Sequence, residues 1–169
     1  MKDLKYFRLD RSEVTEDLFK QIVAAESEDG YTEEQLRCLW IEDEKDDNFV
    51  CMDNDKIVAN ISYNPLSKRR NGSIYMVNLS VLPEYRRQGI AIELINTATE
   101  YYLSKGQTLK MSTSVDKDNL PALKLYQKVG FEIKEPVCEL DEDDKQFILD
   151  ADLELIKNKI ENIKNEMLK

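Results

Sequence analysis

Residues 79–91 read LSVLPEYRRQGIA, and this stretch decides the class of fold that the chain adopts. An apolar, β-branched run leads into it from residue 73, and Pro83 ends that run, as expected for a buried strand. Apolar residues then recur at helical spacing from about residue 89 to residue 105, and Gly106 is placed to cap the helix. The stretch therefore predicts a strand, a short turn and the start of a helix.

The predicted start of this helix is suited to binding an anion. A helix N-terminus presents unpaired backbone N–H groups and carries a partial positive charge. Gly89 has no side chain to keep a ligand away from the backbone, and Arg86 and Arg87 add positive charge beside it. This combination favours a phosphate group as the ligand. The alternative is an ordinary strand-to-helix turn with two surface arginines.

A second informative stretch, residues 119–131, reads NLPALKLYQKVGF. Pro121 predicts the start of a short helix, apolar residues follow at helical spacing, and Gly130 ends it. A strand of about residues 108–115 precedes this helix, and strands of about residues 131–140 and 146–149 follow it. The chain thus alternates strands and helices over its central part.

Together, the two stretches resemble motifs of the GNAT family of N-acetyltransferases. That family combines a Q/R-x-x-G-x-G/A motif after its fourth strand with an N-x-x-A-x-x-L-Y-x-x-x-G-F motif after its fifth, and both occur here in order. The resemblance covers about residues 49–150, and helices predicted at residues 14–25 and 32–40 suit the family's N-terminal pair. It implies an α/β (α+β) fold with a mixed, mostly antiparallel twisted sheet, flanked by helices and splayed between strands 4 and 5.

The resemblance also implies acetyl-coenzyme A as the acyl donor, and it implies no metal. The turn and the first helical residues would wrap the pyrophosphate, and the strand before them would pair with pantetheine. The N–H of Leu79 would face the thioester carbonyl, and Tyr126 would protonate the leaving thiolate as the catalytic residue. The alternative for Tyr126 is a core tyrosine packed by Leu125 and Phe131. The implied cofactor-binding residues are Leu79, Ser80, Val81, Arg86, Arg87, Gln88, Gly89, Ile90, Ala91, Ile92, Asn119 and Tyr126.

The general base is the point at which the sequence departs from part of the family. Some members carry a glutamate four residues before the position of Leu79, and here that residue is Tyr75. A phenol with an ordinary pKa of about 10 is a poor base at neutral pH. Asp116, Glu84 and residues of the N-terminal helices remain candidates.

Composition limits the chemistry further. The chain of 169 residues contains no histidine, which excludes Ser-His-Asp catalysis and histidine-ligated metal sites. Its three cysteines lie far apart, which favours reduced thiols in the cytoplasm over a disulfide or zinc site. The net charge of −10 argues against nucleic acid as a partner, and no apolar run could span a membrane. The N-terminus lacks the apolar core of a signal peptide, so we expect a cytoplasmic protein.

The sequence predicts two parts, residues 1–150 as the acetyltransferase domain and residues 151–169 as an amphipathic helix. That helix packs either on its own domain or on a second copy, as in a homodimer. Its apolar seam consists of Leu153, Ile156, Ile160, Ile163 and Met167.

We expect direct transfer of the acetyl group to a primary amine in a ternary complex, because no cysteine lies near either motif to form a covalent intermediate. The acceptor is a small-molecule amine or a protein amine. The alternative function is a non-catalytic coenzyme A-binding sensor or interaction module.

Overall fold

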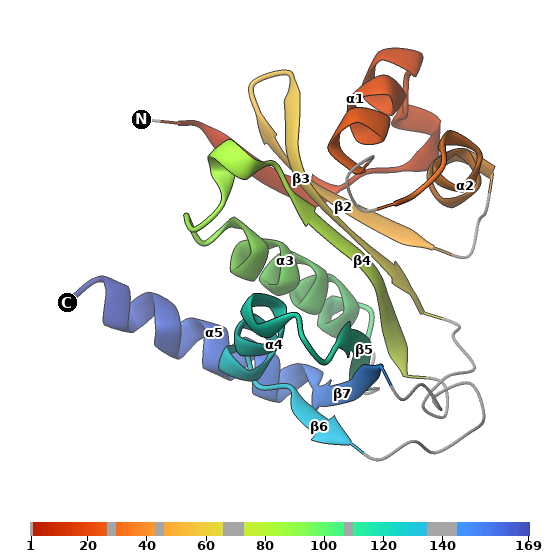
Figure 1. Ribbon diagram of the computed structural model, residues 1–169. Helices are drawn as coiled ribbons and strands as arrows, with labels where there is room; N and C mark the ends of the chain where they lie inside the picture. The colour runs from red at the N-terminus through yellow and green to blue at the C-terminus, as the bar shows by residue number, and fades with distance from the viewer. Residues whose placement is uncertain (1, 27–29, 43–45, 66–72, 107–109, 135–144) are drawn as a thin grey trace. The chain divides into compact units, whose positions relative to one another are not determined.

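The computed structural model describes residues 2–26, 30–42, 46–65, 73–106, 110–134 and 145–169 (Figure 1). The chain divides into two compact units. Unit 1 comprises residues 1–64 and 77–98, and unit 2 comprises residues 65–76 and 99–169. None of the helices in the described ranges is long and apolar enough to cross a membrane.

Unit 1 contains three antiparallel strands, β1 (Leu4–Arg8), β2 (Asp47–Asp53) and β3 (Lys56–Asn64). Apolar runs on either side of the turn Asp53-Asn54-Asp55 predict a hairpin, and β2 and β3 form it. Its turn places Asn54 in the left-handed region with φ of 55°. Strand β1 pairs Tyr6 with Cys51 and was not anticipated from the sequence. Five residues of mixed polarity give too weak a local pattern to identify such a strand.

The helices of unit 1 form the predicted N-terminal pair. After a short helical turn, η1 (Arg11–Glu13), come α1 (Glu16–Glu26) and α2 (Glu33–Arg37), and α2 continues into the wider turn η3 (Cys38–Glu42). The pattern Thr32-Glu33-Glu34-Gln35 predicts a capping box, and Thr32 and Gln35 form it at the start of α2. In Figure 1 the two helices lie beside β2 and β3. Their apolar faces and the strands enclose one core, which includes Phe19, Ile22, Leu36, Trp40, Val50 and Ile57.

Two elements have residues in both units, β4 (Ile74–Val81) and α3 (Ile90–Ser104). A one-turn helix, η5 (Pro83–Tyr85), joins them, and Pro83 ends β4 as expected. Both β4 and α3 lie where the sequence predicts them, because their apolar periodicity is strong and each is bounded by proline or glycine.

Unit 2 contains β5 (Lys110–Asp116), α4 (Leu120–Lys128), β6 (Glu132–Lys134), β7 (Gln146–Asp152) and α5 (Leu153–Met167). The strand predicted at 131–140 is present as β6 over three residues, and positions 135–140 lie outside the described residues. Helix α5 is the predicted C-terminal amphipathic helix. Within this unit it buries the first three residues of its apolar seam, Leu153, Ile156 and Ile160.

The strands pair in the order β1-β2-β3-β4-β5-β7-β6, and the sheet is mostly antiparallel. One pair is parallel, with Ile74 opposite Met111 and Tyr75 opposite Ser112. Both β4 and β5 are described in full, and this pairing covers only the first two residues of β4. The predicted α/β fold, with a mixed, mostly antiparallel sheet flanked by helices, is confirmed.

Candidate active site

Strand β4 presents one buried and one half-buried face. Burial alternates along the strand because successive side chains of a strand point to opposite faces. Leu79 and Val81 are half-buried, whereas the Ser80 side chain is buried and its hydroxyl donates to the backbone carbonyl of Ala25 at 3.4 Å. Ser80 can therefore reach a ligand only through its backbone, as the strand-pairing role expected of residues 79–81 requires.

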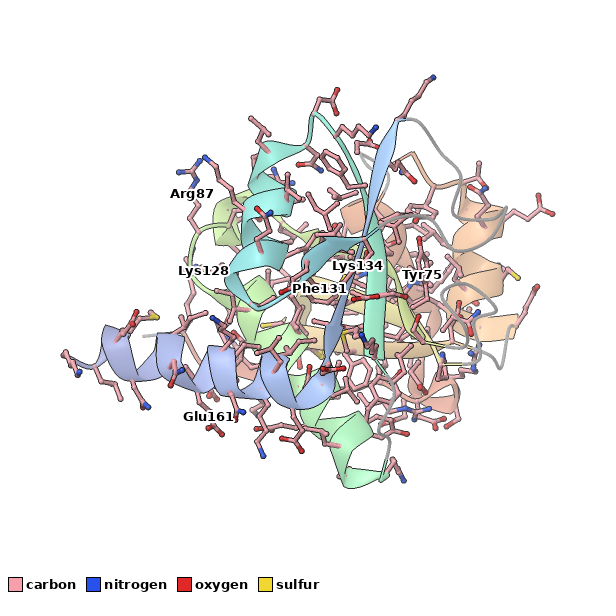
Figure 2. All side chains as sticks on the ribbon, turned by 90° about the horizontal axis from the view of Figure 1, so that it is seen from below. Tyr75, Arg87, Lys128, Phe131, Lys134 and Glu161 are labelled. Atoms are coloured by element: carbon pink, nitrogen blue, oxygen red, sulfur yellow. The ribbon has the colours of Figure 1, made fainter. Side chains whose placement is uncertain are left out.

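The turn after β4 has an unusual backbone. Arg87 adopts φ of 60°, a left-handed conformation that costs energy for a residue with a side chain, and Gly89 adopts φ of 79°. The Nε of Arg86 donates to the carbonyl of Val81 at 2.9 Å, which fixes the start of the turn. The side chains of residues 86–88 are exposed, and Arg87 extends outward from the ribbon in Figure 2.

The first turn of α3 lies directly behind this backbone. The carbonyl of Gly89 accepts the first helical hydrogen bond, from Glu93, so Gly89 is the residue that precedes the helix. It has no side chain to satisfy the N–H groups of the first turn, which lack partners within a helix. A Cβ atom at Gly89 would meet no other atom within 4 Å, so the backbone faces open space. Exposed N–H groups, a helix N-terminus and two arginines make this turn fit to bind a phosphate.

Tyr85 anchors the turn to the edge of unit 1. Its hydroxyl donates to Oδ2 of Asp53 at 2.7 Å, and the Nζ of Lys2 lies 4.0 Å from the centre of its ring. Lys56 forms an ion pair with Glu84 at 3.1 Å. The sequence analysis missed the contribution of Asp53 and Lys56, because these contacts join segments about 30 residues apart and leave no local pattern.

In unit 2, Tyr126 is a buried residue of the short helix α4. The helix begins because the side chain of Asn119 accepts a hydrogen bond from the N–H of Ala122 at 3.3 Å and Pro121 occupies the first turn. Tyr126 is 8% exposed, and its ring lies 5.8 Å from that of Phe131. Burial, and to a smaller extent the nearby Tyr75 hydroxyl, raises the pKa of Tyr126 to about 12. Its hydroxyl therefore keeps its proton at neutral pH, as a proton donor must.

Tyr75 stands where some family members carry a glutamate. Its hydroxyl shares a hydrogen bond of 2.6 Å with the hydroxyl of Ser114 on β5. Sequence reasoning missed Ser114, since a serine in a strand is normally a surface residue. Tyr75 and Phe131, which follows the last residue of α4 by three positions, are both labelled in Figure 2.

The two other carboxylates considered as the base have structural partners. Glu84 is exposed, and a hydrogen bond from its own backbone, followed by the contact with Lys56, lowers the pKa of its carboxyl, which makes it a weaker base. Oδ1 of Asp116 accepts a hydrogen bond from Nε2 of Gln146 at 2.9 Å. Both carboxylates are thus engaged in contacts within the protein.

The predicted site residues thus form two groups. Residues 79–92 are continuous in unit 1 and form the strand end, the turn and the helix start. Asn119 and Tyr126 share one helix of unit 2, where Asn119 caps the helix that carries Tyr126. The hydroxyl groups of Tyr75 and Ser114 belong to the same unit.

Comparison with known proteins places these features in a family. A model of the acetyltransferase (GNAT) family matches residues 12–131. An N-acetyltransferase of Methanocaldococcus jannaschii is 32% identical over 99 residues, covering 56% of this chain and 42% of its own length. The chain spans about half the length of the curated relatives that it matches.

Two solved structures share the fold. The ribosomal-protein-S18-alanine N-acetyltransferase of Escherichia coli has a TM-score of 0.70 and 17% identity, covering 89% of this chain and 94% of its own. An aminoglycoside 6'-N-acetyltransferase complexed with coenzyme A also has a TM-score of 0.70, at 14% identity, covering 88% of this chain and 97% of its own.

Proposed function

The chain belongs to the acetyltransferase (GNAT) family, and from that premise we propose that it transfers an acetyl group from acetyl-coenzyme A to a primary amine. The observation that carries the proposal is the exposed left-handed turn of Arg87 and Gly89 at the N-terminus of α3. This turn has the backbone donors and positive charge that a pyrophosphate needs. The relatives named above act on a ribosomal protein and on aminoglycosides, so both protein amines and small amines suit the acceptor.

Unit 1 supplies the residues proposed to bind the cofactor. The backbone of residues 86–92 donates N–H groups to the pyrophosphate, and the strand end at residues 79–81 pairs with the amide groups of pantetheine. The N–H of Leu79 then faces the thioester carbonyl, where it stabilises negative charge that develops on the oxygen. Acetyl-coenzyme A supplies a thioester whose carbonyl carbon is attacked by the amine, with release of the thiol.

Unit 2 supplies the proposed catalytic residue, Tyr126. Its protonated, buried hydroxyl donates a proton to the thiolate as the carbon–sulfur bond breaks. Asn119 contacts the cofactor near pantetheine while it also caps the helix that carries Tyr126. The transfer is direct, from thioester to amine. Neither Cys38 nor Cys51 lies within residues 79–92 or 119–131, where the two motifs fall.

The competing function is a coenzyme A-binding module without catalysis. Tyr126 discriminates between the two, because a protein that only binds the cofactor does not require a buried, protonated phenol. Release of free thiol from acetyl-coenzyme A in the presence of a panel of amines separates them directly. Release of thiol that depends on the added amine supports the acetyltransferase function over the binding module.

Thermal denaturation tests the cofactor site. At 100 times its dissociation constant a ligand adds about 2.7 kcal/mol to the free energy of unfolding, which raises Tm measurably. Acetyl-coenzyme A should therefore raise the Tm of the wild type. Gly89→Glu should abolish this rise, because it places a side chain and a negative charge where the pyrophosphate binds.

Gly106→Glu is the matched control. Gly106 has φ of 75°, and a Cβ atom there would also meet nothing within 4 Å, so the backbone strain of the two substitutions is alike. This control should keep the full rise in Tm. An equal rise in the Gly89→Glu variant would show that the cofactor does not bind at this turn.

A further inference from the structure

Glu26 occupies an unfavourable place for a carboxylate. It is the last residue of α1, and its side chain is 0% exposed. The C-terminal end of a helix carries a partial negative charge, and burial removes the water that would stabilise the ionised group. Within α1, which the structure describes throughout, no basic residue lies in the last turn. Departures from local rules of this kind concentrate at functional sites.

Glu26 belongs to a group of buried polar side chains in unit 1. The Nδ2 of Asn60 on β3 donates a hydrogen bond to its Oε1, and Ser80 on β4 donates to the neighbouring Ala25. The end of α1 therefore lies over the region where β3 and β4 run side by side. Asn78 shares the buried face of β4 with Ser80. We call Glu26, Asn60, Asn78 and Ser80 the buried polar cluster.

Two amide atoms of the buried polar cluster are unsatisfied. Oδ1 of Asn60 and Nδ2 of Asn78 are buried, and among the described residues neither has a hydrogen-bond partner. Asn60 is 0% exposed and Asn78 is 9% exposed. Unsatisfied buried polar atoms are costly and therefore rare. Here one atom requires a donor and the other an acceptor.

The chemistry of the cluster specifies a complementary group. Glu26 and Oδ1 of Asn60 together favour a cationic donor, which a primary ammonium group provides. Nδ2 of Asn78 favours an acceptor such as a carbonyl oxygen. Strands β3 and β4 are neighbours, and the N–H of Leu82 donates to the carbonyl of Val58. Counted back from that antiparallel contact, Asn60 and Asn78 are diagonal neighbours, which are typically about 7–8 Å apart. An ammonium group and a carbonyl separated by one carbon atom can bridge that distance with a hydrogen bond at each end.

We propose that Glu26, Asn60 and Asn78 of the buried polar cluster bind the acceptor of the acetyl group, and that the acceptor is an α-amino carbonyl compound. The inference rests on the proposed function and narrows its substrate class. Glu26 and Asn60 bind the ammonium group, and Asn78 binds the carbonyl oxygen of the same molecule. An amino-acid amide and the N-terminus of a peptide both carry this arrangement, whereas a polyamine lacks the carbonyl oxygen.

The position of the cluster suits such a role. Asn78 and Ser80 flank Leu79, whose N–H is proposed to face the thioester, and adjacent residues of a strand are only about 3.3 Å apart. Entry of the acceptor requires the last turn of α1 to separate from β4. The Ser80–Ala25 hydrogen bond that joins them is long, at 3.4 Å, and is therefore weak.

The first test compares Glu26→Gln with Glu34→Gln. Both variants lose one negative charge in unit 1, but Glu34 is exposed on α2. With glycinamide as acceptor, Glu26→Gln should raise KM about 10- to 100-fold, the range expected for loss of a charged hydrogen bond. Its kcat and its acetyl-coenzyme A thermal shift should change little. Glu34→Gln should leave KM within about 2-fold of the wild type, as expected for an exposed charge.

The second test examines the carbonyl contact through Asn78→Leu, which keeps the side-chain volume and removes the amide donor. Glycinamide and propylamine are compared in the wild type and the variant. The ratio of activity with glycinamide to activity with propylamine should be about 3- to 10-fold lower in the variant than in the wild type. Comparing this ratio between the two proteins cancels the different reactivities of the two amines. A glycine tripeptide amide, run in parallel, shows by its KM whether the source is a peptide or a small molecule.

The outcomes separate the two proposals. If the wild type binds acetyl-coenzyme A and acetylates amines while Glu26→Gln keeps its KM, the cluster is structural and this inference is wrong, although the proposed function stands. If acetyl-coenzyme A neither binds nor reacts, the proposed function is wrong. In that case, or if Glu26→Gln does not fold, the inference is decided by titrating the wild type with glycinamide. NMR signals of the side-chain amides of Asn60 and Asn78 report binding. Saturable shifts support it and unmoved signals overturn it.

Discussion

The surroundings of Tyr126, the proposed proton donor, keep its hydroxyl protonated. Its side chain is buried, its ring lies 5.8 Å from that of Phe131, and burial raises the pKa of its hydroxyl to about 12. A thiol is a fairly good leaving group, with a pKa of about 8.5, so a donor needs only to be close and protonated. Position and protonation are therefore the two properties that the proposed role requires of Tyr126.

Replacing Tyr126 by phenylalanine removes the hydroxyl and keeps the ring. Loss of a proton donor typically costs about 10²- to 10⁴-fold in rate, and the easy departure of a thiolate places the expected fall in kcat near 10². The rise in Tm with acetyl-coenzyme A should persist. Steady-state kinetics with the best amine measures the effect, and Tyr101→Phe on α3 is the control. An unchanged kcat would assign Tyr126 a structural role.

The same tyrosine makes stability depend on alkaline pH. Its pKa is near 10 in the unfolded chain and is raised by burial to about 12 in the folded protein. Between these values the unfolded chain releases a proton that the folded protein keeps, so the free energy of unfolding falls as pH rises. The stabilisation is complete below about pH 10 and is lost by about pH 12, a decrease of about 2–3 kcal/mol.

Urea denaturation of the wild type and Tyr126→Phe at several pH values in this range measures that decrease. The variant should lose less stability than the wild type. Burial also raises the pKa of Tyr6, which is present in both proteins and provides a common background. An equal loss of stability with pH in the two proteins would show that Tyr126 is not the source of the decrease.

At the scale of elements, α5 explains a glycine of the second motif. Gly130 ends α4 with φ of 109°, and a Cβ atom there would lie 3.4 Å from Cγ of Leu155. The glycine therefore combines a left-handed turn with close approach to α5. This motif residue has a packing role in addition to its position after Tyr126.

The stability of unit 2 should depend on the inner face of α5. Ile160 is 0% exposed, so Ile160→Ala should lower the free energy of unfolding by about 2–5 kcal/mol, through lost burial and the cavity that remains. The neighbouring Glu161 is exposed and points away from the helix in Figure 2, and Glu161→Ala should change stability by less than about 0.5 kcal/mol. Equal effects in urea denaturation would show that α5 covers no core within one chain.

At the scale of the whole molecule, charge is distributed unevenly along the chain. Residues 1–50 carry 15 acidic and 7 basic residues, residues 51–135 carry 9 and 12, and residues 136–169 carry 10 and 5. The stretch with both motifs is thus net positive, between acidic flanks. This arrangement suits an anionic cofactor bound by the centre and a cationic acceptor attracted by the remainder.

Raising ionic strength should therefore raise KM for a cationic acceptor. Exposed charges are screened over about 10 Å at 0.1 M salt, so the long-range attraction weakens as salt is added. Initial rates with glycinamide at increasing sodium chloride measure this effect, and a neutral or acidic amine serves as the comparison. A KM that does not change with salt, and no preference for cations, would restrict the acidic residues to a role in solubility.

The sequence alone determined the elements whose signals are local. The periodicity of α1, α3 and α5, the capping box at Thr32 and the turn around Asn54 depend on residues within one or two turns of each other. The two motifs predicted the family, and the first of them the turn between β4 and α3, for the same reason. Structural features that depend on residues close together in the sequence can be identified from the sequence alone.

Only the tertiary structure decided the contacts between distant segments. Strand β1 forms because Tyr6 and its neighbours pair with a hairpin some 45 residues away. The Tyr75–Ser114 and Glu26–Asn60 hydrogen bonds join residues separated by 39 and 34 positions. Such pairs depend on how strands and helices pack, and side-chain burial and protonation follow from that packing. No pattern of neighbouring residues encodes them, so the environment of Tyr126 and the buried polar cluster became visible only in the folded chain.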